Sequence, residues 1–170
     1  MNQNKPDQKI ITDLFSANPE KVIQTINQIK EIGNKDYLPV LFDLLISNPA
    51  EEVKTEIENI LGTIKDKNSA PLFVEALQNE KYKPVQKSIL MACWQNGLDF
   101  SLFLPVFVDL VITEDWETAF EAFTVIENME FLPEDKTIAE AELKIKHALP
   151  SATGQNEYFL KEILVHIKSF

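Results

Sequence analysis

Within residues 1–110, three short segments carry an apolar residue followed by proline, and they recur at nearly constant spacing. The pairs are Leu38-Pro39, Ala70-Pro71 and Leu104-Pro105, so that the prolines lie 32 and 34 residues apart. Proline is tolerated in the first turn of a helix because the backbone N–H that it lacks would have no intrahelical partner there. A helix start that repeats at this interval indicates an array of similar helical units.

Residues 36–64 show what one unit contains. Its apolar positions form two sets, Leu38, Leu41, Phe42, Leu44 and Leu45, then Val53, Ile57, Ile60, Leu61 and Ile64. Both sets follow the period of an amphipathic helix, so the unit is predicted to be a helical hairpin. We expect Asp36 to cap its first helix, and Asn48, directly before Pro49, to cap its second. One hairpin cannot bury both apolar faces alone, which means that neighbouring hairpins must stack on it.

Similar patterns predict five helix pairs along the chain. Their approximate ranges are 7–33, 36–65, 68–97 and 100–130, followed by a divergent C-terminal cap at 133–170. Gly33 and Gly97 are expected to end helices, because a left-handed residue there closes the last turn. The four glycines of the chain fit poorly with the many tight turns of a β-rich fold.

Several segments carry a resemblance to a known family. The sequences LPVLFDLL at 38–45 and VKTEIENILG at 53–62 resemble the first and second helices of a HEAT repeat, and weaker copies extend the resemblance over roughly residues 7–130. The resemblance implies an all-α fold, a right-handed α-α superhelix in which about five antiparallel helix pairs form a short solenoid. The length of 170 residues fits one domain of ordinary size, so we expect a single repeat domain over residues 1–170. Ankyrin and tetratricopeptide repeats have similar periods, but their signature motifs are absent.

Charge is distributed unevenly along the chain. The net charge is −11, and all 16 basic residues are lysines. Arginine supplies the planar, bidentate contacts that recognise phosphates, so its absence argues against a nucleic-acid partner. Residues 88–170 carry 14 acidic residues against 5 lysines, and no lysine occurs between Lys87 and Lys136. The third quarter of the chain is therefore predicted to present a negative surface.

The candidate partner-binding residues follow from the resemblance, because the second helices of HEAT-like pairs line a concave surface. They are Lys54, Glu58, Lys87, Glu114, Trp116, Glu117, Glu121 and Thr124, and the polar faces of these helices also include Thr25 and Gln86. Glu114, Glu117 and Glu121 are predicted to stack along one helix beside Trp116 and Phe120. Aromatic side chains supply buried contact area and carboxylates steer a cationic partner, so we expect a basic or amphipathic protein or peptide. The same residues are also compatible with an ordinary solvated helix face.

Two other functions remain open on the same scaffold. One is a HEAT-like accessory chaperone of the lyase type, which handles an enzyme or its cofactor. The other is a HEAT-like DNA glycosylase, in which Trp94, Trp116 and a nearby acid would capture a modified nucleotide, although the missing arginines argue against it. The partner's identity and the oligomeric state do not follow from the sequence.

The sequence contains little that indicates a catalytic or metal-binding site. His147 and His166 are 19 residues apart and fit no metal-binding spacing, and no nucleophile motif or glycine-rich phosphate loop is present, so we expect neither catalysis nor a cofactor. The lone Cys93 is predicted to be a buried apolar side chain. The polar start MNQNKPDQK and the lack of an apolar run near about 18 residues lead us to expect no signal peptide, no membrane span and a cytoplasmic location.

Overall fold

The computed structural model describes residues 6–32 and 35–168, and within these ranges every regular element is a helix. The chain divides into two compact units, Met1–Asn96 and Gly97–Phe170. The ten α-helices of the described residues form five consecutive pairs, so the predicted all-α, HEAT-like repeat architecture is confirmed. The expectation that residues 1–170 act as one domain stays a prediction.

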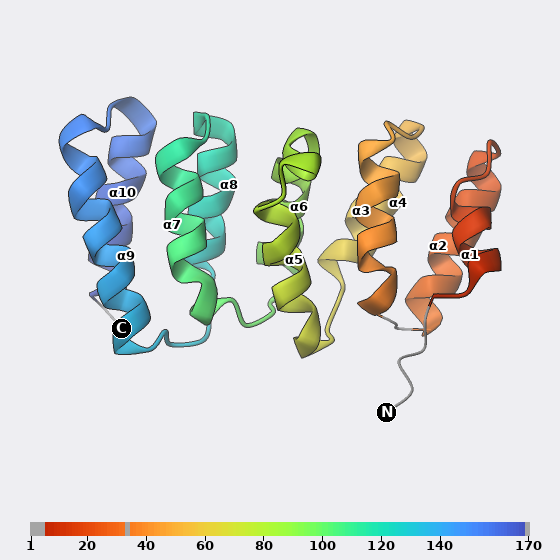
Figure 1. The fold of residues 1–170 in the computed structure, drawn as a ribbon, viewed down its shortest axis with the longest axis horizontal. Coiled ribbons are helices and arrows are strands. Elements are labelled where there is room, and N and C mark those ends of the chain that lie inside the picture. The colour runs from red at the N-terminus through yellow and green to blue at the C-terminus, as the bar shows by residue number, and fades with distance from the viewer. Residues whose placement is uncertain (1–5, 33–34, 169–170) are drawn as a thin grey trace. The chain divides into compact units, whose positions relative to one another are not determined.

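The first unit contains three helix pairs. They are α1 (Gln8–Leu14) with α2 (Pro19–Ile32), α3 (Leu38–Ile46) with α4 (Glu51–Gly62), and α5 (Ala70–Leu77) with α6 (Gln86–Asn96). Helix α4 packs against both α2 and α6, and α3 packs against α5, so neighbouring pairs bury each other's apolar faces as the repeat pattern requires (Figure 1). Three 3₁₀ helices precede or join these elements: η1 (Lys35–Tyr37), η2 (Lys67–Ser69) and η3 (Glu80–Val85).

An aromatic cluster joins the second and third pairs inside this unit. The ring of Phe42 meets that of Phe73 edge-on at 5.5 Å and that of Tyr82 at 5.7 Å, and all three side chains are buried. The Tyr82 hydroxyl donates a hydrogen bond of 2.7 Å to Oδ1 of Asp43, which also accepts one of 2.6 Å from Nζ of Lys81. Helix α3 and η3 are therefore joined by apolar contact in the core and by polar contact at the surface.

The second unit contains two helix pairs, α7 (Leu104–Thr113) with α8 (Trp116–Glu127) and α9 (Asp135–Ala148) with α10 (Gly154–Ile167). Helix α7 packs against α9 and α8 packs against α10, so the same neighbour-to-neighbour arrangement recurs (Figure 1). The 3₁₀ helices η4 (Ser101–Phe103) and η5 (Leu149–Ser151) lie before α7 and after α9. Nζ of Lys144 on α9 forms an ion pair of 2.8 Å with Oδ2 of Asp109 on α7, at the edge of this packing.

The helix ends agree with the sequence in part. Pro39, Pro71 and Pro105 all lie in the first turns of their helices, as predicted. Gly97 has a φ of 62° and follows directly on α6, so its predicted role as a helix stop is confirmed. Gly33 lies outside the described residues.

Two predicted caps are wrong. Tyr37, at the end of η1, is the N-cap residue of α3, and no side chain caps that helix, because Asp36 lies one residue too early. Ala50 is the N-cap residue of α4, and Asn48 instead adopts a left-handed φ of 57° just after α3. Asparagine tolerates this conformation, so Asn48 ends one helix rather than beginning the next.

Candidate functional site

Helix α8 carries an exposed aromatic stripe. Trp116 and Phe120 lie one turn apart, with 57% and 46% of their surfaces exposed. Thr124 follows after a further turn, and its hydroxyl donates to the backbone oxygen of Phe120 at 2.8 Å. Residues spaced by four lie on the same side of a helix, which makes these three a continuous strip along α8.

Acidic side chains lie beside this strip. Glu117 and Glu121 are one turn apart on α8, each next to an aromatic residue in the sequence. We call the surface formed by Trp116, Glu117, Phe120, Glu121 and Thr124 the α8 face. Exposed aromatic rings and carboxylates on one helix side form a surface that attracts cations and offers apolar contact area.

The predicted helical stacking of Glu114 on this face is wrong. Asp115 is the N-cap residue of α8, so Glu114 lies in the turn before the helix, where its backbone N–H donates to the oxygen of Leu110 at 3.0 Å. The side-chain amide of Asn156 donates to the backbone oxygens of Glu114 and Val111 at 3.1 Å and 3.0 Å. The start of α10 is thereby tied to the turn that positions α8.

The start of α8 is fixed by Asp115. Its Oδ1 accepts hydrogen bonds from the backbone N–H groups of Glu117 at 3.0 Å and Thr118 at 3.2 Å, and its Oδ2 accepts one from the Thr118 hydroxyl at 3.1 Å. These bonds, chiefly the one from the backbone N–H of Thr118, lower the pKa of the Asp115 carboxyl. The cap is therefore ionised at neutral pH and adds negative charge beside the α8 face.

Helix α10 contributes an exposed aromatic residue, Tyr158, that is not among the candidates predicted from the sequence. Phe159 stacks on Phe123 with ring centroids 4.9 Å apart and also contacts the ring of Phe120 at 5.9 Å. Tyr158 touches Phe159 and is 54% exposed. Tyr158 could have been recognised in the sequence as an aromatic residue that lies outside the apolar stripe formed by Phe159 and Ile163. The buried ring of Phe159 touches both Phe120 and Tyr158, so the exposed Tyr158 of α10 lies close to the aromatic strip of α8.

The remaining candidates lie in the first unit. Lys54 and Glu58 are half-buried on α4 and Lys87 is exposed on α6. Oε1 of Glu58 accepts a hydrogen bond of 2.7 Å from the Ser88 hydroxyl, so this carboxylate joins α4 to α6. The prediction that the second helices of all pairs line one concave surface stays a prediction.

Two residues assigned to the exposed polar faces are instead buried. Thr25 is 5% exposed and its hydroxyl donates to the backbone oxygen of Lys21 at 2.8 Å. Gln86 is 6% exposed and its side-chain amide donates to the backbone oxygen of Leu77 at 2.9 Å, which links α6 to the end of α5. Both polar groups are paired within the structure, and neither offers a contact to a partner.

Chemistry-bearing groups are sparse in the described parts of the chain. Cys93 is buried as predicted, and desolvation raises the pKa of its thiol well above the usual range, so it is a poor nucleophile. Among residues 6–32 and 35–168 there is no group of three or more His, Cys, Asp and Glu side chains placed to bind a metal ion. Within the same ranges no helix combines the length and apolar character needed to cross a membrane.

A comparison with models of protein families agrees with the repeat pattern. A family model described as HEAT repeats matches residues 9–94, which is half of the chain. No curated protein sequence matches. Among matching solved structures, the crystal structure of an engineered protein is 20% identical, with 95% of this chain and 78% of that chain covered and a TM-score of 0.49.

Proposed function

The chain belongs to the HEAT-repeat family, and from this premise we propose that it is a non-catalytic scaffold that binds a basic or amphipathic protein or peptide through the α8 face. HEAT repeats are generally protein-interaction scaffolds and are typically not catalytic. The general function, protein binding, thus rests on the family, whereas the proposed surface and the type of partner rest on the residues of α8.

The observation that carries this proposal is the exposure of Trp116 and Phe120 on one side of α8. Large aromatic side chains dominate the binding energy of protein interfaces because they bury much area at little entropic cost. Glu117 and Glu121 lie beside them, and the sequence contains no lysine between Lys87 and Lys136. A partner with lysine or arginine around an apolar anchor complements both properties.

Fluorescence tests direct binding. The chain has two tryptophans, so Trp116 is the only one in a Trp94→Phe protein, and excitation at a wavelength that tyrosine does not absorb reports on it alone. Titration with an amphipathic peptide of lysine and leucine should shift its emission to the blue, because the ring leaves water. Added salt should weaken the binding by screening the carboxylates. A peptide of glutamate and leucine in the same pattern is the control, and equal binding of both peptides would contradict the role of charge.

Charge reversal tests the surface. The double substitution Glu117→Lys and Glu121→Lys should lower affinity for the basic peptide about tenfold, because attraction becomes repulsion. Glu75→Lys with Glu140→Lys is the matched control, since it changes the net charge equally at exposed positions on α5 and α9. Helicity and melting temperature should stay close to wild type in both proteins. An equal loss of affinity in the control would show that only net charge matters.

Affinity capture identifies the natural partner. The wild-type chain, the α8 double variant and the control variant serve as baits in cell extract at low and high salt, with quantitative mass spectrometry as the readout. The proposal requires at least one basic protein that the wild type and the control retain and the α8 variant loses. Capture that is indifferent to the α8 substitutions would refute the assignment of this face.

A further inference from the structure

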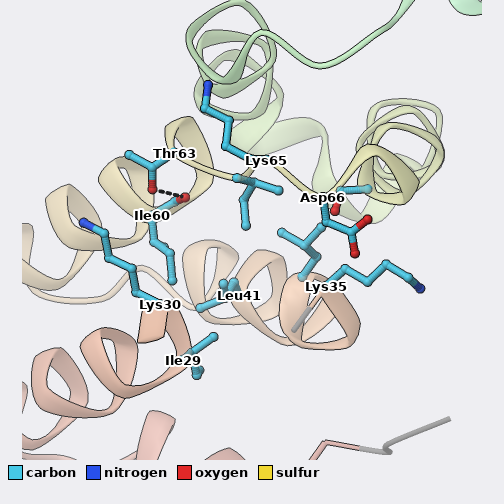
Figure 2. Close-up of a pocket in the computed structure, with 11 residues that line it drawn as sticks. Ile29, Lys30, Lys35, Leu41, Ile60, Thr63, Lys65 and Asp66 are labelled. Atoms are coloured by element: carbon cyan, nitrogen blue, oxygen red, sulfur yellow. Dashed lines mark hydrogen bonds between the residues drawn. The ribbon is translucent and has the colours of Figure 1, made fainter. Parts of the chain in front are cut away.

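The first unit contains an apolar cavity that the α8 face does not involve. Its volume is about 300 Å³, and its wall includes Ile29 from α2, Leu41 from α3 and Ile60 from α4. Thr63 lies at its edge and donates to the backbone oxygen of Ile60 at 2.9 Å (Figure 2). This volume is at the lower limit for pockets that bind small molecules, and it suits one or two apolar side chains.

Lysines surround this cavity. Figure 2 shows the side chains of Lys30, Lys35 and Lys65 extending outward from the apolar centre, so their amino groups lie around it rather than inside it. Nζ of Lys35 pairs with Asp36 at 3.2 Å, and Nζ of Lys65 donates to a backbone oxygen at 2.6 Å. Asp66 is the one acidic residue of the wall, and its carboxylate accepts two hydrogen bonds from Asn68. The wall therefore carries a positive excess around an apolar floor. We call it the lysine-rimmed socket.

The second unit carries a feature of opposite character. Between α8 and α9 the chain turns through Phe131 and Leu132, which are 45% and 64% exposed. The next residue, Pro133, is buried and anchors the turn. Acidic residues flank the apolar pair on both sides, and Glu130, Glu134 and Asp135 are all exposed. We call residues 130–135 the acidic plug.

We propose that the acidic plug of one copy of this chain inserts into the lysine-rimmed socket of a second copy. Phe131 and Leu132 supply the apolar side chains that fill the cavity, and the carboxylates beside them meet the lysines around it. Two adjacent apolar side chains at a turn tip are costly to leave in water, and a cavity that lacks contacts on one side gains dispersion energy when filled. The pairing accounts for both features at once.

This contact has a geometric consequence. The plug and the socket are different surfaces, so the contact is heterologous, and each copy that donates a plug still presents a free socket. A second such contact either joins the same two copies, which then exchange plugs in a closed dimer, or recruits a further copy into a ring or chain. The contact is small compared with stable interfaces, so it should be weak and concentration-dependent.

Sedimentation velocity over a range of concentrations tests association. The average mass of the wild type should rise above the 19.4 kDa of one chain as concentration increases, and high salt should reduce the effect. Phe131→Ser with Leu132→Ser should lower the association constant about tenfold or more, because the buried apolar area is lost. Leu102→Ser with Leu143→Ser is the matched control, since both are exposed leucines of the same unit.

Charge exchange tests the pairing itself. Lys30→Glu with Lys35→Glu should give a monomer, and so should Glu130→Lys with Glu134→Lys, because each variant sets like charges against each other. A mixture of the two variants should associate again, since each then offers the other complementary charges. Circular dichroism checks that each variant is folded.

Three outcomes would overturn the proposal. The first is a wild type that stays monomeric at every concentration, which would assign the socket to some other occupant. The second is association that survives removal of Phe131 and Leu132. The third is a mixture of the charge variants that remains monomeric. None of these outcomes bears on the α8 face, because Glu117→Lys with Glu121→Lys should leave self-association unchanged.

Discussion

The hydrogen bond between Tyr82 and Asp43 gives the sharpest test of how neighbouring repeats hold together. Removing the hydroxyl with Tyr82→Phe keeps the buried ring against Phe42 and deletes only the donor. A hydrogen bond to a charged group contributes about 1.5–3 kcal/mol when it is shielded from water. The side chain of Asp43 is 40% exposed, so solvent competes for it. We therefore expect a loss of about 1 kcal/mol in the free energy of unfolding.

A double-mutant cycle isolates this interaction. Urea unfolding is measured for wild type, Tyr82→Phe, Asp43→Ala and the double variant, all in a Trp116→Phe background so that Trp94 reports the first unit. The coupling energy between the two positions should be about 1 kcal/mol, with unchanged denaturant slopes. If Tyr82→Phe lowered the free energy of unfolding equally in the wild-type and Asp43→Ala backgrounds, the reasoning would be refuted, because the effect would then come from packing alone.

The same contact should respond to alkaline pH. Desolvation, and then the hydrogen bond to Asp43, raise the pKa of the Tyr82 phenol above its ordinary value of 10.0. A folded-state pKa above the unfolded value means that the stabilisation is complete below about pH 10 and is lost as pH rises through the folded pKa. The difference in unfolding free energy between wild type and Tyr82→Phe should therefore shrink in that window.

Three further substitutions test individual sites. Asp115→Ala removes the cap of α8 and should lower the unfolding free energy by about 1 kcal/mol at pH 7. The pKa of the Asp115 carboxyl is lower in the folded than in the unfolded protein. Its stabilisation is therefore present at pH values above the unfolded-state pKa and is lost as pH falls through the folded-state pKa. Urea unfolding in strong acid should accordingly show a smaller difference in unfolding free energy between wild type and Asp115→Ala. Asn48→Ala should lower the free energy of unfolding by about 1 kcal/mol, whereas Asn48→Gly should lower it little, because alanine is strained in a left-handed backbone conformation. Equal losses from the two substitutions would contradict the φ of 57° at Asn48. Ser69 is fully buried and its hydroxyl has no hydrogen-bond partner among residues 6–32 and 35–168. Ser69→Ala should therefore leave the melting temperature unchanged or raise it, and a clear decrease would reveal a partner for that hydroxyl.

The sequence predicts the helix pairs well because their signal is local and redundant. Pro39, Pro71 and Pro105 mark helix starts through the chemistry of proline alone, and the apolar stripes between them have the period of a helix. Asn48 shows where such reasoning fails. Asparagine serves both as an N-cap and as a left-handed helix stop, and the choice depends on where the preceding helix ends.

The surfaces were harder to predict because they depend on side chains from several helices. Gln86 reads as polar and exposed in the sequence, yet its amide finds a carbonyl at the end of α5 and is buried there. Tyr158 becomes part of the aromatic surface only because Phe159 stacks against α8. The walls of the lysine-rimmed socket come from α2, α3, α4 and the segment after α4. The apolar period of any one helix cannot predict a cavity that several helices form together.

The packing of each helix pair mainly on its neighbours has a consequence for folding. A chain in which most contacts join residues close in sequence has a low contact order, so few long loops must close before native structure forms. Each hairpin of the first unit can pack on the preceding one once its own second helix has left the ribosome. We expect such a chain to fold rapidly and to tolerate the gain or loss of a whole hairpin during evolution better than an insertion within one.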